Sequence, residues 1–396
     1  MIAERIARMD PSPTLQVSAR ARRMRAEGID IVDLSAGQPD FPTPEHIKQA
    51  ACKAIADNQT RYTDNEGIPE LREAIAHKLK TENGVSYSPA DIIVSCGAKQ
   101  SLYNACLALV NKGDDVLIPS PYWVSYPAQV ALAEGNAVYV PRREANDFVL
   151  TVADLEAKLT RRSKLIFINT PCNPTGAVYS AEQLAELCEF AVARGLWLLL
   201  DEIYEKLVYD GVPHVCPASL SERIKERTIV INGVSKSYAM TGWRIGYAAG
   251  PSEVINAMKT IQSHSTSNTA SISQYAALAA IAGPQDDMRR MTATFQRRRD
   301  VLFEGLQSLP GLRVNRAKGA FYLFCNIEGL FGKQHAGKKI SNSADFAAYL
   351  LEAAHVAAVA GEAFGAPSYV RFSYATSTEQ LEKAVVRIRD AILKLA

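Results

Sequence analysis

Short apolar runs alternate with segments of helical pattern from about residue 90 to residue 250. The apolar runs, which we expect to be strands, lie at 91–95, 115–118, 137–140, 164–168, 196–200 and 228–231. Between them lie helical patterns at 98–111, 123–134, 151–159 and 180–194. Strands that are apolar at nearly every position are buried on both faces. The alternation therefore predicts an α/β fold with a mostly parallel sheet covered by helices.

The two ends of the chain carry different signals. Residues 1–45 contain a helical segment, and residues 290–396 contain long amphipathic helices with strands at 320–324 and 369–373. Ser377 and Gln380 have the spacing of a capping box before the last helix. Because 396 residues are many for one core, we expect a large domain at 46–289 and a smaller α+β domain built from 1–45 and 290–396.

Composition is that of an ordinary globular protein. The chain is 47% hydrophobic and 22% charged, with a net charge of +2, which argues against a nucleic-acid-binding protein. Arginine clusters at 22–23, 161–162 and 297–299 are interspersed with acidic and apolar residues. We interpret these clusters as solvated helix faces.

Cysteine usage and the N-terminus point to the cytoplasm. The seven cysteines form no CxxC pair, and their odd number argues against a secreted disulfide framework. The first eight residues carry several charges and no apolar core, and no stretch has the roughly 18 apolar residues of a membrane span. The six histidines show no close cluster with cysteines or carboxylates in the sequence, so no metal site is expected.

Polar residues follow the predicted strands, at the end of a parallel sheet where ligands bind. These segments are 95–99, 169–176, 201–204 and 232–236. In the last of them, Lys236 lies in a loop at a strand end, eight residues before Arg244. A lysine and an arginine in this arrangement are placed to bind a carbonyl and a phosphate on one small molecule. That combination points to pyridoxal 5′-phosphate.

Three motifs occur in order: Asn-Pro-Thr-Gly (173–176), Asp-Glu-Ile-Tyr (201–204) and Ser-Lys followed by Thr-Gly-Trp-Arg (235–244). With this spacing the chain resembles the class I aminotransferases of the fold-type-I pyridoxal-phosphate family over nearly its whole length. The resemblance implies a seven-stranded sheet in the large domain. It also implies transamination between L-aspartate and 2-oxoglutarate, giving oxaloacetate and L-glutamate, with a ping-pong mechanism through pyridoxamine phosphate.

The resemblance assigns roles around the cofactor ring. Lys236 would bond the cofactor carbonyl and move the proton at the substrate Cα. Asp201, at the end of an apolar run, would pair with the ring nitrogen. Tyr204 and Asn173 would bind the ring 3′-oxygen, and Trp123 would stack on the ring. The alternatives are a surface lysine, a structural salt bridge, a turn asparagine and core aromatics.

The same resemblance places the cofactor phosphate at the start of a helix. Arg244 would hold it together with the backbone around Gly97, Ala98 and Lys99, and with Ser235. Tyr62 is similar to the family residue that reaches the phosphate of a neighbouring subunit, which implies a homodimer with shared active sites. Considered by itself, a tyrosine before a helix is more often a packing residue.

Substrate carboxylates call for further cationic groups. Arg371 matches the family arginine that binds the α-carboxylate, with the backbone of Gly37 and the side chains of Trp123 and Asn173 nearby. Residues 263–268 contain no arginine for the distal carboxylate. Bacterial relatives of this kind have Gly-x-Lys-Gln, which matches 97–100, so Lys99 becomes the candidate. The alternative is a solvated lysine at a helix N-terminus, where the helix dipole disfavours it.

Other functions remain open at this point. Aromatic amino acids, alanine or prephenate could be substrates, although Asp10 replaces a lysine of the prephenate-accepting relatives. The same cofactor could instead catalyse a β- or γ-elimination. A non-catalytic cofactor-binding regulator would need an N-terminal winged helix, and only about 30 residues precede the segment around Gly37. Apart from a second copy of the chain, we expect only small-molecule partners.

Overall fold

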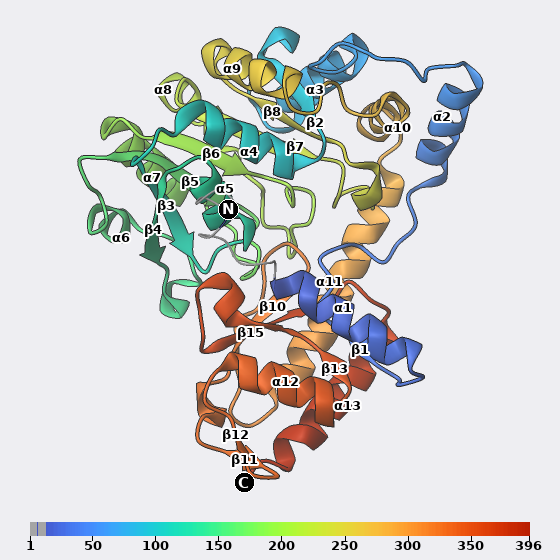
Figure 1. The fold of residues 1–396 in the computed structure, drawn as a ribbon, viewed down its shortest axis with the longest axis vertical. Helices are drawn as coiled ribbons and strands as arrows, with labels where there is room; N and C mark the ends of the chain where they lie inside the picture. Colours follow the sequence, from blue (N-terminus) through green and yellow to red (C-terminus); the bar gives the residue numbers. More distant parts are fainter. Residues whose placement is uncertain (1–5, 7–12) are drawn as a thin grey trace.

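A seven-stranded sheet forms the centre of the larger body of the protein (Figure 1). The structure is a computed structural model that describes residue 6 and residues 13–396; Asp10 therefore lies outside the described residues. The sheet has the order β2-β8-β7-β6-β5-β3-β4. Its strands are β2 (Ile92–Ser95), β3 (Asp115–Ser120), β4 (Asn136–Pro141), β5 (Ser163–Asn169), β6 (Trp197–Asp201), β7 (Thr228–Gly233) and β8 (Gly246–Ala249).

The predicted mostly parallel, seven-stranded sheet is confirmed. The strands β4, β3, β5, β6 and β7 pair in parallel, and β8 runs antiparallel to both β7 and β2. The strand β8 was absent from the segments predicted from the apolar pattern, because it is short and contains only glycine, tyrosine and alanine. Gly246 is required there, since a Cβ atom would lie 2.1 Å from the backbone nitrogen of Ala98.

Helices cover both faces of this sheet. Successive strand residues alternate between two apolar cores; Leu199 belongs to one, and Leu198 and Leu200 belong to the other. The helices are α2 (Glu45–Ala56), α3 (Pro69–Glu82), α4 (Ala98–Leu109), α5 (Ser125–Leu132), α6 (Val152–Glu156), α7 (Ala181–Ala193), α8 (Glu222–Lys225), α9 (Ser252–Ser263) and α10 (Ser271–Ala282). The helix α4 packs on β6, β7 and β8.

The two ends of the chain come together in the lower part of Figure 1. A four-stranded sheet has the order β14 (Val359–Ala360), β15 (Tyr369–Ser373), β10 (Tyr322–Asn326) and β9 (Arg313–Val314). Near the N-terminus, β1 (Val32–Asp33) pairs with β13 (Val356–Ala357), and β11 (Gln334–His335) pairs with β12 (Lys338–Lys339). The helices are α1 (Pro13–Ala26), α11 (Asp286–Gln307), α12 (Ser343–Ala353) and α13 (Thr378–Leu393). The domain limits at 46–289 stay a prediction.

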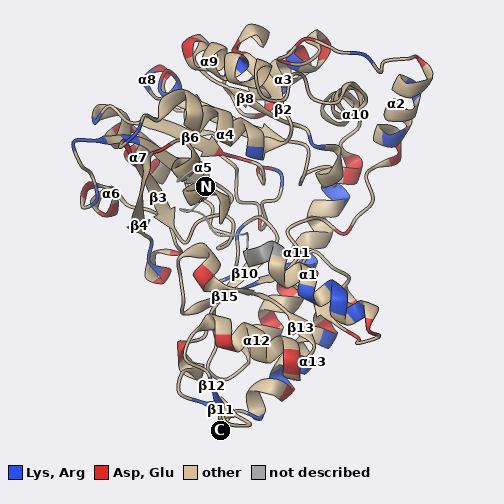
Figure 2. Cartoon of the chain, viewed as in Figure 1, with Lys and Arg blue, Asp and Glu red and all other residues tan. Residues whose placement is uncertain are grey.

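Charged residues of both signs lie across the surface, with Lys and Arg concentrated on α1 (Figure 2). The prediction of a solvated arginine cluster at 297–299 is wrong for two members. Arg299 is fully buried and binds Asp210 through both terminal nitrogens, at 2.7 and 2.9 Å. Arg298 is 7% exposed and binds Asp40 in the same way. Both are buried because a carboxylate satisfies each guanidinium fork.

Two smaller expectations concern the cap of α13 and the cysteines. The Ser377 hydroxyl accepts a hydrogen bond from the backbone N–H of Gln380, which is one of the two bonds of the expected capping box at the start of α13. All seven cysteines are free thiols. Within residues 13–396, no helix combines the length and the apolar character that crossing a membrane requires.

Candidate active site

A cavity of about 600 Å³ lies beyond the carboxyl ends of the parallel strands, where these meet β10, β15 and α1. It brings together eleven of the residues predicted from the sequence: Gly37, Ala98, Lys99, Trp123, Asn173, Asp201, Tyr204, Ser235, Lys236, Arg244 and Arg371. Gly97 does not line the cavity itself, but it lies against Arg244, which does. Tyr62 does not line the cavity and is 91% exposed.

Lys236 lies three residues after the end of β7 and is half-buried in the cavity wall. Its amine donates a hydrogen bond to the backbone oxygen of Gly37 at 2.5 Å. Burial, together with the positive charges of Arg244 and Arg371, lowers the pKa of Lys236 to about 8. At pH 7 about a tenth of the amine is then uncharged, which is the form that attacks a carbonyl.

Asp201 ends β6 and is 5% exposed. One carboxylate oxygen accepts from the Tyr126 hydroxyl at 2.8 Å, and the other accepts from the backbone N–H of Ile203 at 3.2 Å. Burial raises the pKa of Asp201 to about 6 although these hydrogen bonds oppose it. A cationic ring nitrogen next to this carboxylate would keep it ionised.

Arg244 and the start of α4 form a concave wall. The N-cap of α4, Gly97, has φ +83°, and a Cβ atom there would lie 2.3 Å from the Nη2 atom of Arg244. Arg244 has φ +59°, and its guanidinium donates to the backbone oxygens of Thr241 at 2.8 Å and Cys96 at 3.3 Å. A guanidinium at a helix N-terminus, on a wall kept open by glycine, fits a phosphate group.

Arg371, in β15, is 3% exposed and holds a fixed orientation. Nη1 donates to Asn173 Oδ1 at 3.0 Å and Nη2 donates to the backbone oxygen of Ser35 at 2.9 Å. The buried Nε has no hydrogen-bond partner, and no carboxylate pairs with this arginine among the residues that the structure describes. Burial lowers the pKa of the guanidinium. A buried cation that lines a cavity and has no carboxylate partner is an arrangement that an anionic ligand completes.

Tyr204 and Trp123 supply aromatic walls. The Tyr204 hydroxyl lies 2.9 Å from the hydroxyl of Tyr322, and burial raises the pKa of Tyr204 well above its usual range. Trp123 is half-buried and packs edge-on against Tyr126. The Lys99 amine lies 5.0 Å from the centre of the Trp123 ring, and burial and the charge of Arg244 lower the pKa of Lys99.

Several cavity residues were missed from the sequence. Tyr322 and Ser18 line the cavity from segments that carry no recognised motif, and Ser35 lies in the family-like segment 34–41 but was assigned no role. Arg22 was interpreted only as surface; it is exposed, but it also lines the cavity mouth. Tyr126 lies four residues before Val130 on α5 and had the pattern of a core aromatic. Only the 2.8 Å hydrogen bond from its hydroxyl to Asp201 shows that Tyr126 holds this carboxylate in place.

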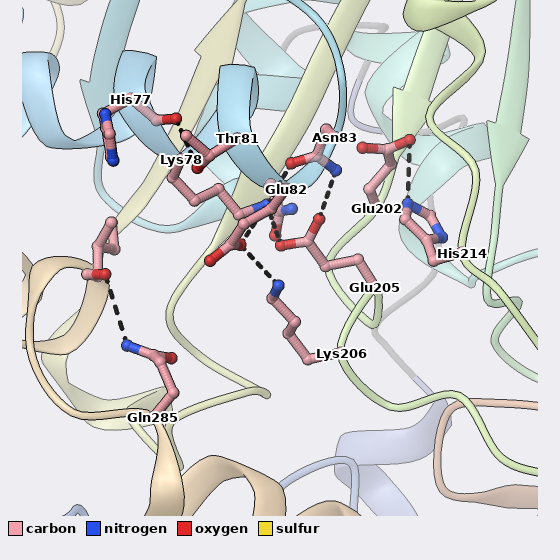
Figure 3. Close-up of polar contacts among 12 residues, drawn as sticks. His77, Lys78, Thr81, Glu82, Asn83, Glu202, Glu205, Lys206, His214 and Gln285 are labelled. Atoms are coloured by element: carbon pink, nitrogen blue, oxygen red, sulfur yellow. Dashed lines mark hydrogen bonds and ion pairs between the residues drawn. The ribbon is translucent and has the colours of Figure 1, made fainter. Parts of the chain in front are cut away.

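A second cluster of buried charges lies nearby (Figure 3). Lys78 binds a carboxylate oxygen of Glu205, and Asn83 donates to the other oxygen at 2.8 Å. Nε2 of His214 lies 3.3 Å from a carboxylate oxygen of the fully buried Glu202. The expectation that no histidine clusters with carboxylates is therefore wrong for His214. The chain folds back after residue 205 and brings it against Glu202.

This cluster balances its own charges. Burial alone would raise the pKa of Glu205, but Lys78, His214 and Lys206 outweigh it and lower the pKa to about 2. Burial alone would lower the pKa of His214, but Glu202 and Glu205 raise it. Glu202, Glu205 and His214 have the spacing of metal ligands. However, the Lys78 ammonium already supplies a cation to Glu205, so we interpret the cluster as two buried ion pairs.

Comparison with known proteins identifies the family. The family model for class I and II aminotransferases matches residues 29–388. The chain belongs to this family. The aminotransferase is 48% identical over 388 residues to the aspartate aminotransferase of Geobacillus stearothermophilus, covering 98% of both chains. Its structure matches the aspartate aminotransferase of Rhizobium meliloti with a TM-score of 0.97 and 47% identity over the whole of both chains.

A second solved structure, the aspartate aminotransferase of Thermus thermophilus with maleate, matches with a TM-score of 0.93 and 42% identity over 99% of both chains. The aminotransferase depends on pyridoxal 5′-phosphate, as the motifs predicted. Its residues fit that cofactor. The wall at Gly97 and Arg244 accommodates a phosphate, Asp201 is placed to pair with a ring nitrogen, and the Lys236 amine lies in the same cavity.

Proposed function

We propose that this aminotransferase transfers the amino group of L-aspartate to 2-oxoglutarate, giving oxaloacetate and L-glutamate. The observation that carries the proposal is Arg371, a buried guanidinium that has no carboxylate partner among the described residues and shares one cavity with Lys236. The two relatives named aspartate aminotransferase support the choice of substrate.

Pyridoxal 5′-phosphate supplies a carbonyl that bonds to amines and a ring that withdraws electrons from the substrate Cα. Lys236 has a pKa of about 8, so its amine can accept a proton from Cα and return it. Asp201, held by Tyr126 and the N–H of Ile203, keeps a negative charge at the ring nitrogen. Its fixed position keeps the ring cationic and therefore electron-withdrawing.

Arg371 orients the substrate. Because Asn173 and Ser35 fix two of its nitrogens, only one edge of the guanidinium can take the α-carboxylate. A carboxylate held there would lie in the same cavity as Lys236, which would bring the proton on Cα toward the amine. Gly37, whose backbone oxygen binds Lys236, lies beside the same site and keeps its backbone close to the substrate.

Lys99 is our proposed partner for the distal carboxylate. It is in the first turn of α4, half-buried in the cavity wall, with its amine near the Trp123 ring. Burial and Arg244 lower its pKa, so a carboxylate there would be a stabilising partner for the ammonium. The solved structure of the Thermus thermophilus relative contains maleate, a dicarboxylate, which supports a dicarboxylic substrate but does not identify the residue that binds it.

We further propose a cytoplasmic homodimer. Tyr62 is 91% exposed, although tyrosine usually has its ring packed. A second copy covering this region would bury Tyr62 and could bring it to the neighbouring cavity. Seven free thiols support a reducing compartment. Sedimentation of the wild type and of Tyr62→Asp tests the dimer, which a buried carboxylate should weaken.

The test of the reaction is a panel of single-turnover half-reactions, followed by the loss of the cofactor's carbonyl absorbance. L-Aspartate and L-glutamate should react faster than L-alanine or L-phenylalanine. In Lys99→Met the dicarboxylic substrates should slow selectively, and L-alanine should not. Equal slowing of all substrates would exclude Lys99 as the distal site. Release of ammonia without a keto-acid acceptor would show an elimination instead.

Prephenate is a second candidate keto acid. A relative from Cereibacter sphaeroides, 48% identical over 390 residues, is named aspartate/prephenate aminotransferase. Prephenate should therefore be included as an acceptor beside 2-oxoglutarate. A rate within about tenfold of that with 2-oxoglutarate would establish the additional activity, since such a difference corresponds to about 1.4 kcal/mol.

A further inference from the structure

Tyr322 touches both halves of the active site. It belongs to β10, is fully buried, and lines the cavity. Its hydroxyl lies 2.9 Å from that of Tyr204, and its ring centre lies 4.3 Å from the guanidinium carbon of Arg371. Tyr204 is assigned to the cofactor and Arg371 is assigned to the substrate carboxylate. Tyr322 therefore contacts one residue of the cofactor site and one residue of the substrate site.

The sheet explains this placement. Tyr322 pairs with Ser373 across the β10–β15 ladder, and Phe324 pairs with Arg371. Tyr322 and Arg371 are therefore diagonal neighbours on one face, a spacing that aromatic and long side chains can bridge. Phe364 packs on the same guanidinium, 5.0 Å from its carbon atom. Tyr204 approaches Tyr322 edge-on from the turn that follows β6, with ring centres 5.9 Å apart.

We propose that Tyr322 is a positioning residue that couples the cofactor-binding and substrate-binding sides of the site, through its hydroxyl to Tyr204 and through its ring to Arg371. This inference rests on the proposed roles of Tyr204 and Arg371. Nothing in the three sequence motifs points to Tyr322, which lies more than 100 residues beyond Tyr204.

The hydrogen bond has a preferred direction when the cofactor is bound. Tyr204 has one O–H proton, and donating it to the ring 3′-oxygen leaves its own oxygen as an acceptor for the Tyr322 hydroxyl. Each bond in such a chain polarises the next, so Tyr322 makes Tyr204 a stronger donor. A stronger donor favours negative charge on the ring oxygen, and the proton of the lysine–cofactor linkage leaves more easily.

The ring acts separately. The Tyr322 face attracts the buried cation and, with Phe364, holds the plane of the guanidinium. A planar group held in this way loses little freedom when a carboxylate binds to it. The hydroxyl should therefore affect the cofactor and the ring should affect substrate binding, so two substitutions can separate the two effects.

The first test is Tyr322→Phe, which keeps the ring and removes the hydroxyl. The visible absorbance of the bound cofactor is titrated with pH in the absence of substrate. The midpoint should rise by about 0.5 unit, which is about threefold in proton affinity, while KM for L-aspartate stays within about twofold. A midpoint unchanged from that of the wild type would overturn the proposal.

A double-mutant cycle shows whether Tyr322 acts through Tyr204. Tyr204→Phe removes the acceptor, so adding Tyr322→Phe to that variant should shift the midpoint no further. Independent, additive shifts would contradict a coupled pair. Because the readout is an absorbance midpoint, a general loss of stability or activity does not imitate the result.

The second test is Tyr322→Leu with Phe364→Leu as the matched control. Both remove a ring from Arg371, and each should raise KM for L-aspartate and 2-oxoglutarate by about 3- to 30-fold. Only Tyr322→Leu should also shift the absorbance midpoint. If neither variant changes KM, the ring has no role in substrate binding. If the wild-type cofactor shows no pH-dependent visible band, the proposed role of Lys236 fails instead.

Discussion

Replacing Arg371 with lysine should remove most of the substrate's carboxylate binding while leaving the cofactor in place. Lysine keeps the positive charge but has no planar fork. It cannot donate to Asn173 and to the Ser35 backbone in the observed geometry and at the same time bind a carboxylate edge-on. It also loses the stacking between the rings of Tyr322 and Phe364.

The size of the effect follows from the number of lost contacts. A hydrogen bond to a charged group contributes about 1.5–3 kcal/mol, and Arg371→Lys removes at least one of the pair made to the carboxylate. The kcat/KM value for L-aspartate should therefore fall by about 10- to 150-fold, with a similar fall for 2-oxoglutarate. Cofactor affinity should fall much less than kcat/KM, since Arg371 contacts only Asn173 among the side chains assigned to the cofactor and touches neither Asp201 nor Arg244.

Steady-state kinetics with both substrates measure kcat/KM. A titration of the apoprotein with pyridoxal 5′-phosphate measures cofactor affinity. Arg298→Lys is the matched control, because Arg298 is also buried and makes a bidentate contact, with Asp40, outside the cavity. That variant should lose stability without a selective loss of kcat/KM. Equal kinetics for Arg371→Lys and the wild type would refute carboxylate binding by Arg371.

Three further changes probe other parts of the structure. Gly97→Ala should lower affinity for pyridoxal 5′-phosphate by about tenfold or more, because the new Cβ would displace Arg244. Gly28→Ala has nearly the same φ, +84°, with no atom within 4 Å of the new Cβ, so an equal loss of affinity in that control would contradict the steric reason. Asp201→Asn removes the buried charge at the ring nitrogen and should lower kcat by at least about 30-fold; a kcat near the wild-type value would exclude that role. His214 has a raised pKa, so its stabilising contribution is complete below the unfolded value of about 6.5 and is lost as pH rises through the folded pKa. Denaturant unfolding of the wild type and His214→Gln at pH 6 and pH 9 should show a difference that shrinks at the higher pH; a constant difference would mean that His214 is not protonated in the folded state.

The fold could be predicted in large part because strands that are buried on both faces are continuous apolar runs in the sequence. These runs located the strands at 115–120 and 163–169 within two residues of their ends. The strand β8 was not found, since Gly246–Ala249 is short and its glycine serves a close contact with α4. The limits of β10 were also shifted, from the expected 320–324 to Tyr322–Asn326.

The site could be predicted where its residues follow strands. Asp201 and Lys236 are found in this way because a parallel sheet gathers its strand ends at one edge. Tyr322 could not be found in this way, because its proposed role depends on a contact between β10 and the distant turn that contains Tyr204. Likewise, the burial of Arg299 depends on Asp210, which lies 89 residues away. The sequence pattern shows charge, but it does not show which distant carboxylate satisfies that charge.

The most direct test of the central claim is the product of a single turnover with L-aspartate, measured without any added keto acid. The holoenzyme is mixed with L-aspartate, and oxaloacetate and ammonia are quantified after the carbonyl absorbance of the cofactor has disappeared. A transaminase that uses Lys236 and Arg371 as proposed should release about one equivalent of oxaloacetate per active site and no ammonia. Continued keto-acid formation with ammonia, or no oxaloacetate at all, would contradict the proposed reaction.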